Sequence, residues 1–337
     1  MTDVVVSTWD SARDVLDRPM REALSRLDGD TRHWCGYHLG LWDADGTPGP
    51  GGGKGIRPML ALLSARAAGA PAEVGVPAAI ACELVHNFSL IHDDVMDGDL
   101  ERRHRPTVWS RFGTSSAILA GDALLALANE ILAEASGPTV AWAVRCLNAT
   151  TRRLIAGQTA DLGFESRDDV DLDECIRMAG DKTSALLGCA ASLGVVLADG
   201  PSELAVGLAE YGEHLGLAFQ LVDDLLGIWG TSERTGKPVW SDLRAGKKSL
   251  PVVAALTAGT PAARRLAALY TADEALTGDR LAEAAALVEE AGGRAWAEEA
   301  VERHSAAATE VLDGLEMPAP VRQELRDLTD KLSRRDY

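Results

Sequence analysis

The sequence predicts an all-α protein, and three observations support this fold class. Apolar residues recur at three- and four-residue spacing through almost all of the chain after residue 58, as expected for amphipathic helices. Alanine and leucine, which are strong helix formers, are abundant, whereas alternation of β-branched residues is rare. No strand–turn–strand pattern and no internal repeat of about 20 to 50 residues occurs, so a helical bundle is favoured over a solenoid.

The predicted elements follow one another between short breakers. We expect one amphipathic helix over about 10–27, followed by a Gly/Pro-rich loop from Asp43 to Gly55. Breakers that contain glycine and proline, such as Gly69-Ala70-Pro71, then separate longer helices. These helices are predicted over 58–70, 76–97, 114–135, 139–165, 171–198, 202–230 and 279–313.

The chain is expected to form one domain, because no change in composition is strong enough to mark a boundary. A chain of 337 residues can bury a large core. We therefore expect a single domain over 1–337, with an N-terminal helix and loop in 1–50, the chemical motifs in 51–255 and packing helices in 256–337.

Net charge excludes one class of function. The 51 acidic and 33 basic residues give a formal net charge of −18, which opposes non-specific nucleic-acid binding because that binding depends on neutralising phosphates. No unbroken run of about 18 apolar residues is present, and the first residues lack the basic and apolar regions of a secretory signal. The five cysteines are scattered, so we expect reduced thiols rather than zinc ligands or disulfides. These features predict a cytoplasmic protein with no transmembrane segment.

Acidic side chains interrupt the apolar helix predicted over 76–97. Asp93 and Asp97 are spaced i, i+4, which places both carboxylates on one helix face, and His86 lies on the same stripe seven residues earlier. Asp94 projects about 100° around the helix and is expected to support them. Oxygen ligands without a nearby cysteine suit a hard cation such as Mg²⁺. The alternative is a polar helix terminus, but these acids interrupt a strongly apolar helix.

A second apolar helix repeats this arrangement. Asp223 and Asp224 end the segment FQLVDD, and Gln220 stands four residues before Asp224, so Gln220 and Asp224 are expected to share a face. The loop that follows contains three lysines: Lys237, Lys247 and Lys248. Two acidic helices, each followed by a basic segment, indicate a shared function.

Two further segments carry cationic side chains. In GGGKGIRP, residues 51–58, glycines allow backbone N–H groups to approach an anion, and Lys54 and Arg57 supply positive charge at a helix start. Lys182 and Thr183 stand together before the apolar run SALLGCAASLG. A flexible linker and a simple helix cap are the structural alternatives for these two segments.

Lysine placement connects the four segments. Only six of the 33 basic residues are lysines, and five of the six fall within these segments. Mg²⁺ and a polyanion would join acidic and basic groups, because phosphate oxygens bind both metal ions and Lys or Arg. The predicted ligand is therefore a diphosphate ester whose apolar tail lies between the apolar helices.

The motifs resemble those of the trans-isoprenyl diphosphate synthase (polyprenyl synthetase) family, over roughly residues 50–255. DDVMD at 93–97 is similar to the first aspartate-rich motif of that family, and GGKGIRP at 52–58 resembles its GGK-x-x-RP signature. ERR, KT, FQLVDD, TGK and GKK follow in the family's order, at 101–103, 182–183, 219–224, 235–237 and 246–248. The resemblance implies the isoprenoid synthase fold, a single large helical bundle around a deep central cavity, usually in a homodimer. It also implies Mg²⁺-dependent head-to-tail condensation of isopentenyl diphosphate with an allylic diphosphate.

The resemblance assigns roles to individual residues. The aspartates implied to hold three Mg²⁺ ions on the allylic diphosphate, and so to serve catalysis, are Asp93, Asp94, Asp97, Asp223 and Asp224. The side chains implied to contact the allylic substrate are Arg102, Lys182, Thr183, Gln220, Lys237 and Lys247, and Arg102 and Lys182 are also implied in catalysis. Those implied to bind the diphosphate of isopentenyl diphosphate are Lys54, Arg57, His86 and Arg103.

One position departs from the family pattern. The second aspartate-rich motif usually reads DDxxD, but here it reads DDLLG, with Gly227 in place of the third aspartate. We expect this change to weaken the support of one metal ion without abolishing binding, because Asp223 and Asp224 remain.

The residues before the first motif bear on product length. Phe88 and Ser89 precede Asp93 by five and four residues, and bulky residues there form the cavity floor in the family that the chain resembles. The pattern is similar to that of synthases with short-to-medium products, so we expect geranylgeranyl diphosphate first and farnesyl diphosphate next.

Two alternative functions stay open. A class I terpene cyclase of the same fold would also use Asp-rich helices and Mg²⁺, but it would not need the implied isopentenyl diphosphate site. A non-catalytic partner subunit of a heteromeric synthase is favoured only by Gly227.

Overall fold

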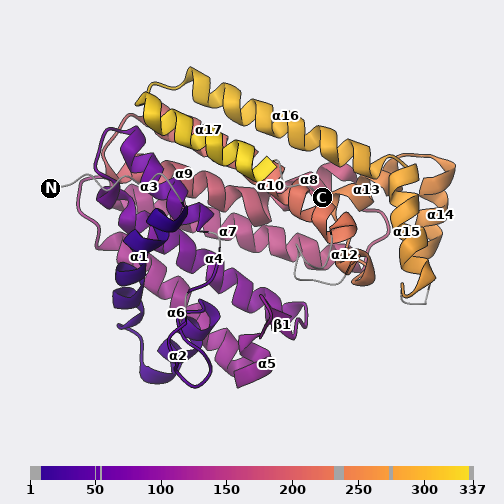
Figure 1. The fold of residues 1–337 in the computed structure, drawn as a ribbon, viewed down its shortest axis with the longest axis horizontal. Coiled ribbons are helices and arrows are strands. Elements are labelled where there is room, and N and C mark those ends of the chain that lie inside the picture. The colour runs from indigo at the N-terminus through magenta and orange to yellow at the C-terminus, as the bar shows by residue number, and fades with distance from the viewer. Residues whose placement is uncertain (1–8, 50, 54, 231–238, 273–275, 334–337) are drawn as a thin grey trace. The chain divides into compact units, whose positions relative to one another are not determined.

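The computed structural model describes residues 9–49, 51–53, 55–230, 239–272 and 276–333, with side chains from residue 15 onward. Helices make up most of this part of the chain (Figure 1), and its only paired strands form one short hairpin. The predicted all-α fold class is confirmed.

The chain forms two compact units, each assembled from separate stretches. The first contains Met1–Thr151, Leu186–Ala209 and Leu315–Leu325, and the second contains Arg152–Ala185, Glu210–Gly314 and Arg326–Tyr337. The single domain expected over 1–337 stays a prediction.

In the described part of the chain, the first ten elements begin with α1 and end with α7. In order they are α1 (Trp9–Leu24), α2 (Gly29–His38), α3 (Ile56–Ala67), the 3₁₀ turn η1 (Ala72–Gly75), α4 (Val76–Met96), β1 (Glu101–Arg102), β2 (Arg105–Pro106), α5 (Val108–Phe112), α6 (Thr114–Ala133) and α7 (Val140–Glu165), with α8 (Leu172–Ala179) following.

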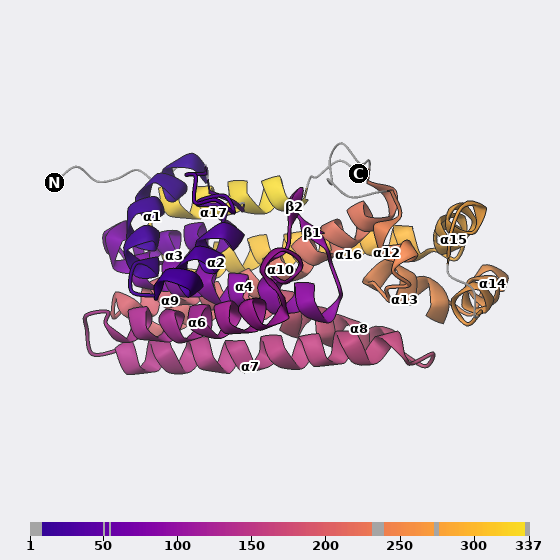
Figure 2. The ribbon, with the colours of Figure 1, turned by 90° about the horizontal axis from the view of Figure 1, so that it is seen from below.

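The remaining elements are again helical. They are the π-helical turn η2 (Gly180–Ser184), α9 (Ala185–Leu197), α10 (Ser202–Trp229), α12 (Ser241–Arg244), α13 (Leu250–Thr257), α14 (Pro261–Tyr270), α15 (Asp279–Glu290), α16 (Gly293–Gly314) and α17 (Ala319–Ser333). Figure 2 shows α7 as one unbroken helix, and α14 and α15 lie side by side in both views.

Close helix packing in the first unit depends on a glycine. Gly194 of α9 lies against α3, so that a Cβ atom at position 194 would stand 2.3 Å from the carbonyl oxygen of Ala61. The backbone N–H of Val195 donates to the hydroxyl of Ser64 at 3.0 Å. The two helices therefore approach at backbone distance, which fixes the position of α3.

In the second unit, two glycines flank the π-helical turn η2. A Cβ atom at Gly157 of α7 would stand 2.4 Å from the backbone nitrogen of Lys182, and one at Gly216 of α10 would stand 2.5 Å from Cα of Ser184. A π turn places one extra residue in a helix and often occurs at functional sites. The core beside it includes Cys175, Leu221, Leu225, Val253 and Ala297. The turn that carries Lys182 and Thr183 is therefore held closely by two helices.

Most predicted helices are confirmed, with three differences. The segment 171–198 is not one helix, because η2 interrupts it. The segment 279–313 is divided at Gly292, whose φ of +93° ends α15 before α16 begins. The sequence does not predict α2 or the hairpin at 101–106. Both are short, and the apolar residues of α2 do not gather on one face, so neither produces a periodic signal.

Among the described residues, two helices are long and apolar enough to cross a membrane, as judged by length and composition: Ala72–Met96 and Thr114–Ala133. Their most apolar windows have a mean hydropathy of 1.5, and 67% and 50% of those windows are buried inside the protein. The criterion of an unbroken apolar run misses both helices, because an average tolerates a few polar residues. Since core helices can pass the same test, these two are weak evidence against the expected absence of a transmembrane segment.

We expect Gly194→Ala to destabilise the protein, because the added methyl group would overlap the carbonyl oxygen of Ala61. Overpacking of this kind costs about 1–3 kcal/mol, so the melting temperature measured by differential scanning calorimetry should fall by a few degrees. Gly163→Ala in α7 is the matched control, because no atom lies near its missing Cβ and alanine favours a helix. Equal melting temperatures for the wild type and Gly194→Ala would contradict the described packing.

Candidate active site

The first acidic motif lies at the C-terminal end of α4, in the first unit. Asp93 and Asp94 are 9% and 1% exposed, whereas Asp97 caps the helix and is exposed. Oδ1 of Asp94 accepts a hydrogen bond from Nε of Arg102 at 2.7 Å. Oδ2 of Asp94 is buried without a hydrogen-bond partner. Asp94 is therefore the most deeply buried acid of the motif.

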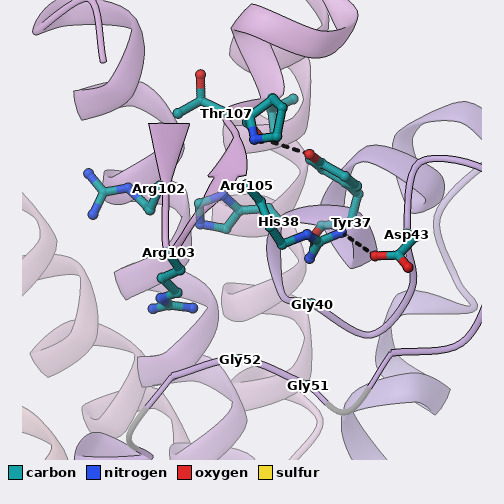
Figure 3. A pocket seen from close by; sticks show the side chains of 12 residues that line it. Tyr37, His38, Gly40, Asp43, Gly51, Gly52, Arg102, Arg103, Arg105 and Thr107 are labelled. Carbon is teal, nitrogen blue, oxygen red and sulfur yellow. Dashed lines mark hydrogen bonds and ion pairs between the residues drawn. The ribbon is translucent and has the colours of Figure 1, made fainter. Parts of the chain in front are cut away.

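A tight hairpin carries the basic residues that follow this motif. Strand β1 pairs antiparallel with β2, and the turn residues Arg103 and His104 have φ values of +53° and +60°. Positive φ at both central positions is typical of a type I′ turn, and it strains residues other than glycine. Figure 3 shows Arg102 and Arg103 leaving the hairpin in different directions. The strained turn thus separates two adjacent guanidinium groups.

Both arginines border a cavity of about 220 Å³ beside the hairpin (Figure 3). Arg105 also lines the cavity, but protein groups hold it: it donates to the carbonyl oxygens of Tyr37 and Trp42, each at 3.0 Å, and to Oδ1 of Asp43 at 3.1 Å. Arg105 therefore anchors the hairpin to the segment before the glycine loop.

The glycine loop approaches the same cavity. A Cβ atom at Gly52 would stand 2.9 Å from Nη1 of Arg103. Gly51, Gly53 and Gly55 have φ values of +79°, +86° and +62°, a conformation that favours glycine. The glycines predicted to admit close approach therefore bring backbone next to a guanidinium group. Lys54 lies outside the described residues.

Arg57 and His86 belong to the same basic region. Arg57 stands in the first turn of α3 and is 9% exposed. Burial, and then the charges of Arg57, Arg103 and Arg102, lower the pKa of His86 well below its usual range. His86 is thus a neutral imidazole among guanidinium groups, an environment that attracts anions. The structure brings Arg57, His86, Arg102 and Arg103 into one region, and the substrate that each of them binds stays a prediction.

His38 of α2 is a member of this region that sequence reasoning missed. Its Nε2 is buried without a hydrogen-bond partner. Burial, reinforced by the charges of Arg103 and Arg102, lowers the pKa of His38 to about 3. No motif marks this residue, because it lies on a helix that the sequence does not predict.

The second acidic motif lies on α10, in the second unit. Asp224 is 4% exposed. Its Oδ1 accepts a hydrogen bond from the side-chain amide of Gln220 at 2.7 Å, and its Oδ2 accepts one from the backbone N–H of Leu250 at 3.0 Å. The side-chain oxygen of Gln220 accepts from the hydroxyl of Thr183 at 2.6 Å. The shared face of Gln220 and Asp224 is confirmed, and Thr183 joins it. Asp223 is less buried than Asp224.

Lys182 and Lys247 place positive charge in this second region. Lys182, in η2, pairs with Asp161 of α7, with 2.5 Å between Nζ and Oδ2, a partner that no sequence motif indicates. The charge of Lys247 lowers the pKa of Asp224. Both lysines therefore contribute to the electrostatic surroundings of carboxylates, as expected for a site that binds metal and diphosphate together.

Lys248 has a structural role. It is buried, and its Nζ donates to the carbonyl oxygens of Phe164, at 2.8 Å, and Arg167. Its ammonium group is therefore bound by backbone carbonyls at the end of α7 and just after it, and lies 3.8 Å from Oδ1 of Asp168. Lys237 lies outside the described residues.

Neither motif is a complete metal site by itself. Within the part of the chain that the structure describes, no three His, Cys, Asp or Glu side chains lie close enough together to hold a metal ion. Mg²⁺ typically binds one or two carboxylates and completes its coordination with water and substrate phosphate. The buried, unpartnered Oδ2 of Asp94 fits such a hard cation.

Burial changes the acidity of one carboxyl group in each motif. It raises the pKa of Asp94 to about 6, against the opposing charge of Arg102. It raises the pKa of Asp224 to about 7, against the opposing charge of Lys247. A divalent cation would favour the ionised form of both groups.

The predicted residues therefore form two sets. The first unit holds the first motif with Arg57, His86, Arg102 and Arg103, and the second unit holds the second motif with Lys182, Thr183, Gln220 and Lys247. That both sets bind one pair of substrates stays a prediction.

Phe88 and Ser89 lie on different faces of α4. Phe88 is 6% exposed, and its ring packs edge-to-face on His92 with 5.2 Å between ring centroids. Nε2 of His92 in turn lies 3.1 Å from the carbonyl oxygen of Ile118 in α6. Ser89 is 7% exposed and stands one turn before Asp93, on the same face. Ser89 is therefore the residue aligned with the first acidic motif.

We expect Mg²⁺ to bind less tightly in acid, because protons compete for Asp94 and Asp224, whose pKa values are about 6 and about 7. Between about pH 8 and about pH 6 the affinity should fall by roughly tenfold or more. Isothermal titration calorimetry with inorganic pyrophosphate present measures this change.

Two variants distinguish the effect of protonating the protein's carboxylates from the effect of protonating pyrophosphate. Asp94→Asn should show a flatter pH dependence than the wild type in the same buffers, whereas the exposed control Asp173→Asn should match the wild type. Identical slopes for Asp94→Asn and the wild type would contradict the role of Asp94.

The chain is similar to known proteins along most of its length. The sequence profile of the polyprenyl synthetase family matches residues 50–288. A (2E,6E)-farnesyl diphosphate synthase from Mycobacterium tuberculosis (strain ATCC 25618 / H37Rv) is 48% identical over 321 residues, which cover 94% of this chain and 89% of that protein. A geranylgeranyl diphosphate synthase from the same strain is 45% identical over 302 residues, which cover 89% and 84%. A crystal structure of polyprenyl synthetase from Streptomyces coelicolor A3(2) has 50% identity and a TM-score of 0.93, covering 98% of this chain and 99% of that chain. The chain therefore belongs to the polyprenyl synthetase family, whose members are prenyltransferases.

Proposed function

We propose that the protein condenses isopentenyl diphosphate head-to-tail with an allylic diphosphate, in a reaction that requires Mg²⁺. Geranylgeranyl diphosphate is the main product and farnesyl diphosphate the next. Similarity to one synthase of each product, at 45% and 48% identity, supports chain elongation. The small side chain of Ser89, aligned with Asp93, supports the longer of the two products.

One observation carries this proposal: each acidic motif contains a carboxyl group buried at an apolar helix, Asp94 and Asp224. An ionised carboxylate in such a place costs free energy unless a cation compensates it. Arg102 compensates one oxygen of Asp94 and leaves the other without a partner. A metal ion carried by a diphosphate would supply the missing charge.

The proposed roles are those that similarity to the polyprenyl synthetase family implies for these side chains. Three Mg²⁺ ions are assigned to the allylic diphosphate, held by Asp93, Asp94, Asp97, Asp223 and Asp224. When bound, these ions stabilise the negative charge that develops on the departing pyrophosphate.

Basic and hydroxyl side chains orient the two substrates. Arg102, Lys182, Thr183, Gln220 and Lys247, with Lys237, bind the allylic diphosphate. The diphosphate of isopentenyl diphosphate is bound by Arg57, His86 and Arg103, with Lys54. Donors fixed in this way need little rearrangement as charge develops, and the apolar helices keep water away from the allylic cation.

We propose a cytoplasmic homodimer. Ile118 and Leu119, adjacent residues of α6, are 46% and 55% exposed, and two neighbouring exposed apolar side chains offer a surface that a second copy of the chain could cover. All five cysteines are free thiols, which agrees with a reducing compartment. Sedimentation velocity measures the oligomeric state, and a monomer at all concentrations would contradict the dimer.

We expect the purified protein to elongate dimethylallyl, geranyl or farnesyl diphosphate when Mg²⁺ and isopentenyl diphosphate are present. Product lengths are read by chromatography after removal of the phosphates, and EDTA should abolish the reaction. Asp94→Asn should lower kcat by about 100-fold or more, because it removes a charge next to the metal-bound leaving group.

Two outcomes would favour other functions. Formation of a hydrocarbon without elongation would indicate a class I terpene cyclase. Elongation that begins only when a second subunit is added would indicate a non-catalytic partner subunit.

We expect Ser89→Phe to shorten the product and Phe88→Ala to lengthen it. A phenylalanine at position 89 would fill the face of α4 that carries Asp93, whereas alanine at position 88 removes a buried ring. Val206→Ala, at a position that is 67% exposed, is the control and should leave the products unchanged. Unchanged product distributions in both variants would contradict the assignment of product length to these residues.

A further inference from the structure

Gly227 stands where the family has the third aspartate of its second motif, and another acid of the second unit, Asp242, lies next to it. A Cβ atom at Gly227 would stand 2.3 Å from Oδ2 and 2.5 Å from Cγ of Asp242. These distances are far below van der Waals contact, so the carboxylate of Asp242 occupies the place that a side chain at position 227 would take. The motif that lacks its third aspartate therefore still has a carboxylate at that turn of α10.

Local structure holds Asp242 in this place. Asp242 lies in the short helix α12, where the hydroxyl of Ser241 approaches both Gly227 and Asp242: it lies 3.4 Å from the carbonyl oxygen of Gly227 and 3.2 Å from Oδ1 of Asp242. Leu243 is fully buried in a core cluster that includes Ile228, the neighbour of Gly227. Helix α12 is thus anchored to α10 at the position of the missing aspartate.

The segment after Asp242 is tied to the same place. The backbone N–H of Lys247 donates to the carbonyl oxygen of Asp242 at 2.9 Å. The hydroxyl of Tyr270 donates to the carbonyl oxygen of Lys247 at 3.4 Å. Lys247, a proposed ligand of the diphosphate, and Asp242 are therefore held in one turn.

Electrostatic coupling connects Asp242 to the second motif. Its negative charge contributes to the raised pKa of Asp224. Both oxygens of Asp224 already accept hydrogen bonds, from Gln220 and Leu250. A cation bound near these two acids would relieve their mutual repulsion.

We propose that Asp242 takes the place of the absent third aspartate and would supply its carboxylate to a Mg²⁺ ion that accompanies the diphosphate. This inference rests on the proposed function, because it assumes that the second motif binds Mg²⁺ with a diphosphate. Asp242 lies outside both aspartate-rich motifs. It would add negative charge and help to position the metal ion, and the absence of a side chain at Gly227 leaves space for it.

Metal counting tests the assignment without using catalysis. Mn²⁺ replaces Mg²⁺, inorganic pyrophosphate replaces the substrate, and electron paramagnetic resonance measures free and bound Mn²⁺. Asp242→Asn, which keeps the shape of the side chain, should weaken the binding of one ion by about tenfold. Asp173→Asn is the control for loss of an exposed acid in the same unit.

Two changes at Gly227 distinguish a charge-supplying acid from a structural one. Gly227→Ala should also weaken the binding of one ion, because the added methyl group displaces the Asp242 carboxylate without changing net charge. The double variant Gly227→Asp with Asp242→Ala restores a carboxylate at the usual position of the motif and should recover the binding lost in Asp242→Asn. Circular dichroism and the melting temperature check that each variant is folded.

The outcomes separate the inference from the proposed function. Unchanged Mn²⁺ binding in Asp242→Asn, or no recovery in a folded double variant, would overturn the role of Asp242. If the wild type binds Mn²⁺ and pyrophosphate, and Asp242→Asn loses one ion, but no primer is elongated, the role of Asp242 stands and the proposed function fails.

Discussion

The free-energy cost of burying carboxyl groups at the ends of apolar helices is the constraint on which the rest of the structure depends. Asp94 and Asp224 lie almost entirely out of water, where an uncompensated negative charge is costly. Their neighbours are therefore donors and cations: Arg102 for Asp94, and Gln220, the Leu250 N–H and the charge of Lys247 for Asp224. The fold compensates only part of the negative charge of these acids, so a divalent cation can supply the rest.

The donors are held in place by close contacts with the backbone of other segments, and only glycine permits contacts so close. Gly52 lies beside Arg103, Gly157 and Gly216 flank the turn of Lys182, and Gly227 makes room for Asp242. At each of these positions a methyl group would collide with a functional residue or with the backbone that carries it. Glycines within long helices, which cost stability by themselves, thus serve the electrostatic arrangement.

Sequence periodicity was sufficient to predict the all-α fold and most long helices, and motif spacing was sufficient to predict that Gln220 and Asp224 share a helix face. The remaining features depend on contacts that are distant in sequence. His38 joins the basic region from an unpredicted helix, and Asp161 pairs with a lysine 21 residues later. The side chain that fills the space at Gly227 comes from residue 242. No local pattern encodes such contacts, because tertiary packing creates them.

The π-helical turn η2 determines what the deletion of one residue from this segment would do to the protein. A π turn is an α-helix with one residue inserted, so deletion of a single residue from Gly180–Ser184 would leave an unbroken helix from α8 through α9. The shortened helix would fold, but the residues on one side of the deletion would rotate by about 100° relative to those on the other. Lys182 and Thr183 would then lose their alignment with Asp161 and Gln220. A single-codon deletion here would therefore remove function while preserving secondary structure.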